Sequence, residues 1–195
     1  MKSLSLDRPY LLITVGIPGS GKSQFAEKFA ATFGAPYVKY DTILHISANN
    51  GRASDGFAGY FLHELFKTNH TVIFDGPTAT RAERAALRDL AASAGYTSLF
   101  IWVQTDLATA KDRFAKTARK QGHRVSGAHY DALVKEFVAP SEKEHPFVVI
   151  SGKHTYATQV KAVLKNLTLA KQTARTVSGH SHTTLSNGKR SITVK

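Results

Sequence analysis

An eight-residue glycine-rich segment constrains the fold of this chain more than any other feature of its sequence. Residues 16–23 read Gly-Ile-Pro-Gly-Ser-Gly-Lys-Ser and fit the pattern Gly-x-x-x-x-Gly-Lys-[Ser/Thr]. An apolar run, residues 10–15, precedes the segment, and residues 23–33 follow it with apolar side chains at helical spacing. The pattern therefore predicts a buried strand, a tight turn and a helix in immediate succession.

This arrangement is typical of a phosphate-binding loop. Glycines let the backbone turn so that successive N–H groups face phosphate oxygens, and the start of the helix adds partial positive charge. We expect Lys22 to reach the β- and γ-phosphates and the Ser23 hydroxyl to ligate Mg²⁺, so ATP and Mg²⁺ are the expected cofactors. The predicted nucleotide-binding residues of the loop are Gly16, Ile17, Pro18, Gly19, Ser20, Gly21, Lys22 and Ser23.

Five short apolar or β-branched runs alternate with helical patterns along the chain. Because these strands are continuous apolar runs, they indicate a sheet that is mainly parallel and covered by helices on both faces, a three-layer α/β fold. Residues 47–59 contain three glycines and two asparagines and are expected to form a loop, with a helix from Tyr60 to Lys67. The predicted strands are Tyr10–Val15, Tyr37–Tyr40, Thr71–Phe74, Thr97–Val103 and Phe147–Ile150.

Two aspartates stand where predicted strands end. Asp41 ends the second strand and Asp75 the third, and the carboxyl ends of parallel strands meet at one sheet edge with the phosphate loop. Phosphoryl transfer uses one carboxylate to organise Mg²⁺ and often another to orient or deprotonate the attacking hydroxyl. We assign Asp75 to the metal and Asp41 to the acceptor. The alternative role of either aspartate is helix capping or turn formation.

A basic helix from about residue 107 to 121 leads into a glycine-containing loop. Three arginines favour a lid over about residues 113–127 that closes on phosphates, with Arg113 binding nucleotide and Arg119 and Arg124 acting in catalysis. Arg113 and Arg119 are about 240° apart around a regular helix, so such a helix cannot point both the same way. The alternative is a solvated basic face.

Positive charge is concentrated at the C-terminus. The chain carries a net charge of +12, and no acidic residue follows Glu144. We divide the chain into a phosphate-loop domain, residues 1–171, and a basic polar tail, residues 172–195, that is disordered or forms a small hairpin at Asn187-Gly188. The alternative for this tail is an arm that binds nucleic acid or another partner through its lysines and arginines.

The remaining composition excludes several classes of protein. Cysteine is absent, which excludes disulfide scaffolds and thiolate metal sites. No apolar run reaches the roughly 18 residues of a membrane span, and the N-terminus lacks the pattern of a signal peptide. We therefore expect a cytoplasmic protein that has no membrane partner.

Longer stretches of the sequence resemble one group of enzymes. The phosphate loop followed by Gln-Phe-Ala, residues 75–84 (Asp-Gly-Pro-Thr-Ala-Thr-Arg-Ala-Glu-Arg), the run 103–119 and residues 137–140 with Glu144 are similar to polynucleotide-kinase-like and zeta-toxin-like P-loop kinases, AAA-type ATP-binding domains. The resemblance covers about residues 10–152. It implies the P-loop NTPase fold of nucleotide-kinase type, ATP with Mg²⁺, a lid arginine and a hydroxyl-activating aspartate at Asp41.

The function expected from these features is an ATP-dependent kinase, a phosphotransferase with an alcohol group as acceptor. The acceptor hydroxyl belongs to a small molecule or to the end of a nucleic acid. The family often has Arg-Asp-Asp where Lys39-Tyr40-Asp41 stands here, so the motifs do not fix the acceptor. The alternative is a nucleotide-dependent binding protein or slow ATPase that has no dedicated acceptor.

Overall fold

A five-stranded parallel sheet forms the centre of the computed structural model, which describes residues 6–49, 56–122 and 124–178. The strands lie in the order β2-β3-β1-β4-β5, and each neighbouring pair runs parallel. This order places the phosphate loop, which follows β1, at the middle of the sheet edge. The strands are β1 (Tyr10–Val15), β2 (Tyr37–Lys39), β3 (Val72–Asp75), β4 (Thr97–Gln104) and β5 (Phe147–Ser151).

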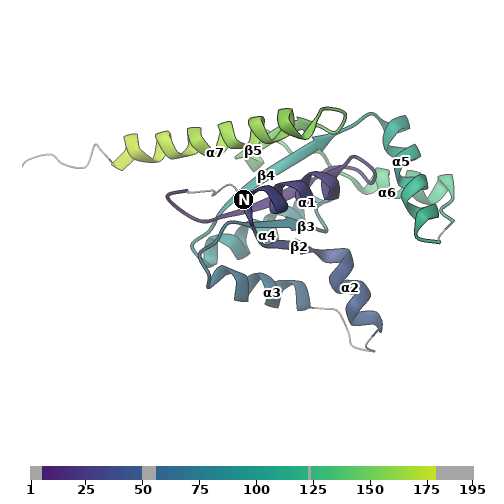
Figure 1. Cartoon of the computed structure of the whole chain (residues 1–195), viewed down its shortest axis with the longest axis horizontal. Helices are drawn as coiled ribbons and strands as arrows, with labels where there is room; N and C mark the ends of the chain where they lie inside the picture. The colour runs from purple at the N-terminus through teal and green to yellow at the C-terminus, as the bar shows by residue number, and fades with distance from the viewer. Residues whose placement is uncertain (1–5, 50–55, 123, 179–195) are drawn as a thin grey trace, which may run out of the picture.

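Helices cover both faces of the sheet, which confirms the predicted three layers (Figure 1). Helices α1 and α7 pack on one face, and α3 and α4 pack on the other. Helices α5 and α6 project beyond the carboxyl ends of the strands, on the side where α2 also lies (Figure 1). The helices are α1 (Lys22–Phe33), α2 (Tyr40–Asn49), α3 (Phe57–Phe66), α4 (Arg81–Ser93), α5 (Leu107–Lys120), α6 (Gly127–Glu136) and α7 (Tyr156–Ser178), with a 3₁₀ turn η1 (Glu142–Glu144).

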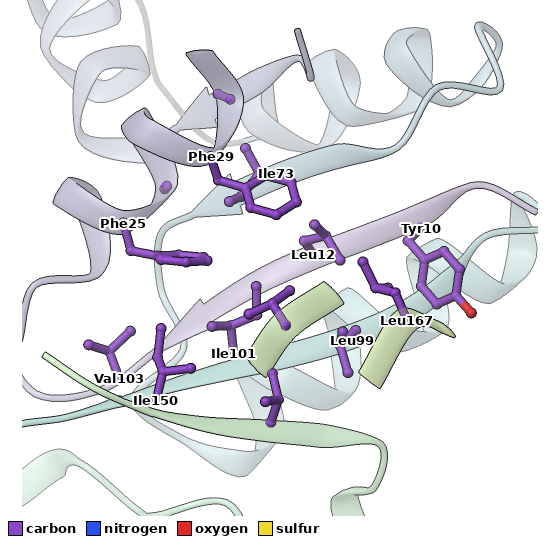
Figure 2. Packing of buried hydrophobic residues seen from close by; sticks show 14 residues of the cluster. Tyr10, Leu12, Phe25, Phe29, Ile73, Leu99, Ile101, Val103, Ile150 and Leu167 are labelled. Atoms are coloured by element: carbon purple, nitrogen blue, oxygen red, sulfur yellow. The ribbon is translucent and has the colours of Figure 1, made fainter. Parts of the chain in front are cut away.

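The core lies on the two faces of β1, all of whose residues are buried. On one face, Phe25 and Phe29 of α1 pack against Leu12 and its neighbours (Figure 2). On the other face, Leu11 and Ile13 pack against residues of α3, α4 and the adjacent strands. Each fully buried large apolar side chain contributes about 1.5–3 kcal/mol, so burial on both faces fixes the strand from which the phosphate loop emerges.

The structure corrects the predicted loop over residues 47–59. Helix α2 continues to Asn49 and α3 already begins at Phe57. Glycine and asparagine lower helix propensity, so the sequence did not predict the end of α2 or the start of α3. These residues do not forbid a helix that packs on its neighbour. The residues between the two helices lie outside the described ranges.

Helix α7 runs without interruption to Ser178 and so crosses the predicted boundary at residue 171, because each further helical residue adds a hydrogen bond even where the sequence is polar. The division into a domain and a tail stays a prediction. The predicted hairpin at residues 187–188 lies outside the described residues. Within the described ranges, no helix is both long and apolar enough to span a bilayer.

Candidate active site

The phosphate loop lies between β1 and α1, as its sequence predicts. Gly19 has a φ of +78°, and a β-carbon there would lie 2.0 Å from the carbonyl oxygen of Ala110 in α5. Gly16 has a φ of +149°, and a β-carbon there would lie 2.6 Å from the carbonyl oxygen of Val103. Glycine is therefore required at both positions by conformation and by the close approach of other backbone segments.

Lys22, the first residue of α1, folds back under this loop. Its ammonium donates to the carbonyl oxygens of Gly16 at 2.7 Å and Ile17 at 3.1 Å. Burial lowers the pKa of Lys22, while the negative charges of Asp75 and Asp41 oppose that shift. The structure thus brings the lysine and both predicted carboxylates together.

Asp75 ends β3 and is only 7% exposed. The Thr14 hydroxyl donates to its Oδ1 at 2.9 Å and the Tyr37 hydroxyl to its Oδ2 at 3.1 Å. Ser23 lies in the first turn of α1, directly after Lys22. A buried carboxylate and a serine hydroxyl are hard oxygen donors, which fit Mg²⁺ bound together with substrate phosphates.

The described residues contain no cluster of three or more histidine, cysteine or acidic side chains that could hold a metal. Magnesium sites that act on nucleotides commonly use only one or two protein ligands and complete their coordination with phosphate and water. Ser23 and Asp75 are therefore the residues that would hold Mg²⁺.

The prediction that Asp41 ends a strand is wrong. Asp41 lies in the first turn of α2. Strand β2 stops at Lys39, and Tyr40 already belongs to the helix. The side chain of Asp41 is exposed and interacts electrostatically with Lys22. The positive end of a helix favours an anionic side chain in its first turn, so Asp41 also stabilises the start of α2.

The predicted lid arginines lie in different surroundings. Arg113 is half-buried, and its Nη1 donates to the carbonyl oxygen of Gly152 at 3.0 Å and lies 3.9 Å from the position of a β-carbon on Gly21. Arg119 is exposed and donates to the carbonyl of Ala115 in its own helix, and Arg124 is exposed after α5. The regular helix therefore brings Arg113 to the phosphate loop and turns Arg119 elsewhere, as the angular argument requires.

No sequence pattern indicates Tyr130 of α6, which contacts the loop directly. Its hydroxyl donates to the carbonyl oxygen of Pro18 at 3.2 Å, and its ring packs 5.3 Å from that of Phe114 in α5. Thr14 and Tyr37, the two donors to Asp75, were not predicted as site residues either. A polar threonine inside the otherwise apolar run of β1 was the signal available for Thr14.

A pocket of about 540 Å³ opens where β4 and β5 end. Ile17 of the phosphate loop, Trp102, and Phe137 supply apolar lining, while Gln104 and Lys153 supply polar groups. Its size and mixed lining are those of a small-molecule site. In the strand order it lies on the opposite side of β1 from Asp75 and Asp41.

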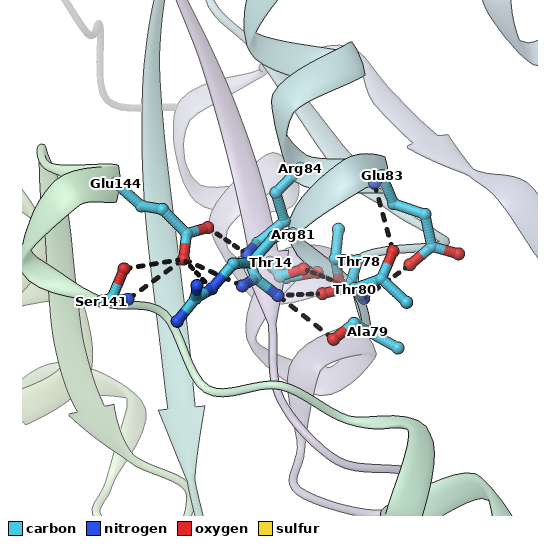
Figure 3. A network of polar contacts seen from close by, with 9 residues as sticks. All are labelled: Thr14, Thr78, Ala79, Thr80, Arg81, Glu83, Arg84, Ser141 and Glu144. Carbon is cyan, nitrogen blue, oxygen red and sulfur yellow. Dashed lines mark hydrogen bonds and ion pairs between the residues drawn. The ribbon is translucent and has the colours of Figure 1, made fainter.

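A buried ion pair supports the loop that follows Asp75 (Figure 3). Arg84 of α4 donates to both carboxylate oxygens of Glu144, at 2.6 and 3.1 Å, and to the carbonyl oxygens of Thr78 and Ala79. The Thr78 hydroxyl in turn donates to the carbonyl oxygen of Thr14 at 3.0 Å. The network joins the end of β1, the segment after β3 and the approach to β5.

The five-stranded parallel sheet and the glycine-rich loop after β1 together define the P-loop NTPase fold. Residues 11–140 match an AAA domain family, which is most of the chain, and the protein belongs to that family. A search of curated proteins finds no match. The narrower likeness to polynucleotide-kinase-like and zeta-toxin-like kinases stays a prediction.

Several solved structures share the fold. A gluconokinase from Sinorhizobium meliloti 1021 is 19% identical with a TM-score of 0.60, and the match covers 87% of this chain and 98% of that one. Kti12 from Chaetomium thermophilum, in complex with ADP-AlF3, is 19% identical with a TM-score of 0.61, covering 80% and 96%. The APS kinase CysC of Mycobacterium tuberculosis, in complex with AMPPNP and APS, is 20% identical with a TM-score of 0.56, covering 83% and 98%.

Proposed function

We propose that this protein is an ATP-dependent kinase that transfers the γ-phosphate of ATP to a hydroxyl group. The observation that carries the proposal is the position of the Lys22 ammonium, held under the phosphate loop and within the electrostatic reach of Asp75 and Asp41. Lysine, a metal-binding carboxylate and a second carboxylate are the groups that phosphoryl transfer to an alcohol requires. Similar structures that are a gluconokinase and an APS kinase support the same reaction class.

Each group has a defined task in this proposal. Lys22 leaves the carbonyl oxygens of its own loop and neutralises charge on the β- and γ-phosphates. Asp41 orients the acceptor and accepts its proton as the acceptor oxygen bonds to the γ-phosphorus and the bond to the leaving oxygen of ADP breaks. Ser23 and Asp75 hold Mg²⁺, which when bound neutralises charge on the phosphates.

The arginines divide between binding and closure. Arg113, beside Gly21, binds the nucleotide. Arg119 and Arg124 lie farther along α5 and in the turn after it, where movement of the lid would bring positive charge onto the transferring phosphate. The Tyr130 hydroxyl donates a hydrogen bond from α6 to the loop at Pro18, so movement of the lid is coupled to the loop.

We infer the placement of the two ends of the nucleotide from the strand order. The γ-phosphate belongs on the side of Asp75 and Asp41, after β3 and β2, and the nucleoside belongs in the pocket at the ends of β4 and β5. The acceptor then approaches from the side of α2. We favour a small hydroxyl compound as acceptor because similar structures include a gluconokinase.

Transfer of ³²P from labelled ATP tests the proposal against a panel of sugars, nucleosides, antibiotics and 5′-hydroxyl oligonucleotides. Lys22→Met should abolish transfer, whereas Lys28→Met, an exposed lysine on the same helix, should not. Asp41→Asn should lower transfer at least about 100-fold without weakening ATP binding, since it removes the proton acceptor and a negative charge near Lys22.

One outcome would contradict the kinase, and another would change its acceptor. ATP turnover that no acceptor stimulates, with the same rate in Asp41→Asn, identifies a slow ATPase or a nucleotide-dependent binding protein. Labelling of the 5′-hydroxyl oligonucleotides alone would retain the kinase and replace the small acceptor with a nucleic-acid end.

A further inference from the structure

Tyr37 is a side chain at this site that no sequence motif assigns. It lies on β2, whereas Asp75, one of the two residues that would hold Mg²⁺, lies at the end of β3. Its hydroxyl donates to Asp75 Oδ2 at 3.1 Å. The phenol thus contacts a metal-binding carboxylate from the neighbouring strand.

We propose that Tyr37 is a positioning residue that holds Asp75 in the orientation that binds the magnesium of Mg·ATP. The inference rests on the magnesium–nucleotide site of the proposed function. It concerns binding and does not depend on which acceptor is phosphorylated, or on whether one is.

The carboxylate needs two donors to be held in one orientation. Asp75 is buried, and its Oδ1 accepts from Thr14 while its Oδ2 accepts from Tyr37. One hydroxyl alone would leave the carboxylate free to rotate about the bond to its β-carbon. With one donor on each oxygen the plane of the carboxylate is fixed, and each oxygen keeps a lone pair for a metal or its water.

A phenol is protonated at neutral pH and carries one O–H donor. The 3.1 Å hydrogen bond directs this donor to Oδ2 of the carboxylate. Groups that orient metal ligands in this way typically contribute a factor of 10–100 to metal affinity or activity.

The test is the affinity for ATP measured by calorimetry, once with excess EDTA and once with excess Mg²⁺. The ratio of the two dissociation constants reports how much the metal strengthens nucleotide binding. Tyr37→Phe should reduce that ratio about 10-fold and leave the affinity in EDTA unchanged. The matched control is Tyr156→Phe, which removes another half-buried tyrosine hydroxyl, the 2.9 Å donor to Thr32.

A double-mutant cycle separates positioning from general support of the fold. If Tyr37 acts through Asp75, Tyr37→Phe should have no further effect on the ratio in the Asp75→Asn protein. The proposal is overturned if Tyr37→Phe keeps the wild-type ratio or raises it, if it lowers the ratio equally in the Asp75→Asn background, or if wild-type protein binds ATP equally with and without Mg²⁺. A failure of every acceptor in the transfer assay would refute the kinase and leave this result standing.

Discussion

Two arginines of α4 meet the same carboxylate from different surroundings, and this permits a controlled test of the polar network. Arg84 is fully buried and Arg81 is 64% exposed, and both contact Glu144, whose side chain is 9% exposed. Substituting each arginine by methionine removes the guanidinium and keeps much of the apolar stem. We expect Arg84→Met to destabilise the protein by about 3–5 kcal/mol and Arg81→Met by about 0–1 kcal/mol.

The difference follows from what each change leaves behind. Without Arg84, Glu144 loses bonds of 2.6 and 3.1 Å and stays buried as a charge with Ser141 as its remaining close partner. The carbonyl oxygen of Thr78 also loses its donor. Arg81, by contrast, stands 3.8 Å from the carboxylate in solvent, where water replaces it readily.

Urea unfolding monitored by tryptophan fluorescence measures both changes with one probe. The chain has a single tryptophan, Trp102, which lies half-buried on β4 with its ring 6.2 Å from that of Phe147. Equal slopes of unfolding free energy against urea would show that the unfolded state is unchanged. Equal losses for the two variants, or a loss below about 1 kcal/mol for Arg84→Met, would refute the assignment of this ion pair as a buried structural contact.

Two further predictions use the same probe. The hydrogen bond from Arg84 holds the pKa of Glu144 below its ordinary value of 4.5. The stability that this ionised pair contributes is therefore present above pH 4.5 and is lost as the pH falls through the lowered pKa. Glu144→Gln should make the urea midpoint less dependent on pH over that acid range. Gly19→Ala should weaken ATP binding at least about 10-fold by calorimetry, because its β-carbon would lie 2.0 Å from the Ala110 carbonyl oxygen, a clash that would shift the loop or α5. Gly122→Ala is the control, because Gly122 has the same φ of +78° but an added β-carbon would have no described neighbour within 4 Å. It should lower the stability by about 1–2 kcal/mol and leave the affinity for ATP unchanged. Equal losses of ATP affinity in the two variants would contradict the role of close packing at Gly19.

The central strands could be predicted because their physical signals are local. The run Tyr10–Val15 is apolar at nearly every position, so neither of its faces can be exposed to water without cost. Such a run predicts a strand buried between two layers. The capping box of Thr80 and Glu83 is equally local, and both of its hydrogen bonds are present. The phosphate loop and Asp75 follow from the same strands, since strand ends position them.

The partners of Asp75 could not be predicted from the sequence. Thr14 and Tyr37 reach the carboxylate only because β2, β3 and β1 are neighbours, and strand order is set by the crossovers of the whole chain. Arg84 and Glu144 are separated by 60 residues, and their pairing depends on the segment that crosses from α6 to β5. Asp41 was placed on a strand end because helix boundaries are weakly encoded where a helix starts directly after a strand.

The strand order also explains why the two aspartates of the site do not form ion pairs with Arg113. Asp41 and Asp75 follow β2 and β3, on one side of the phosphate loop, whereas Arg113 donates to Gly152 just after β5, on the other. Lys22, at the loop between them, has its pKa lowered by burial and raised by both aspartates. Anionic phosphates would therefore extend from the arginine side to the lysine, and the carboxylates would meet only the terminal phosphate and its metal. In the proposed function this separation would favour transfer of the γ-phosphate, because negative side chains repel a polyanion except where a cation stands between them.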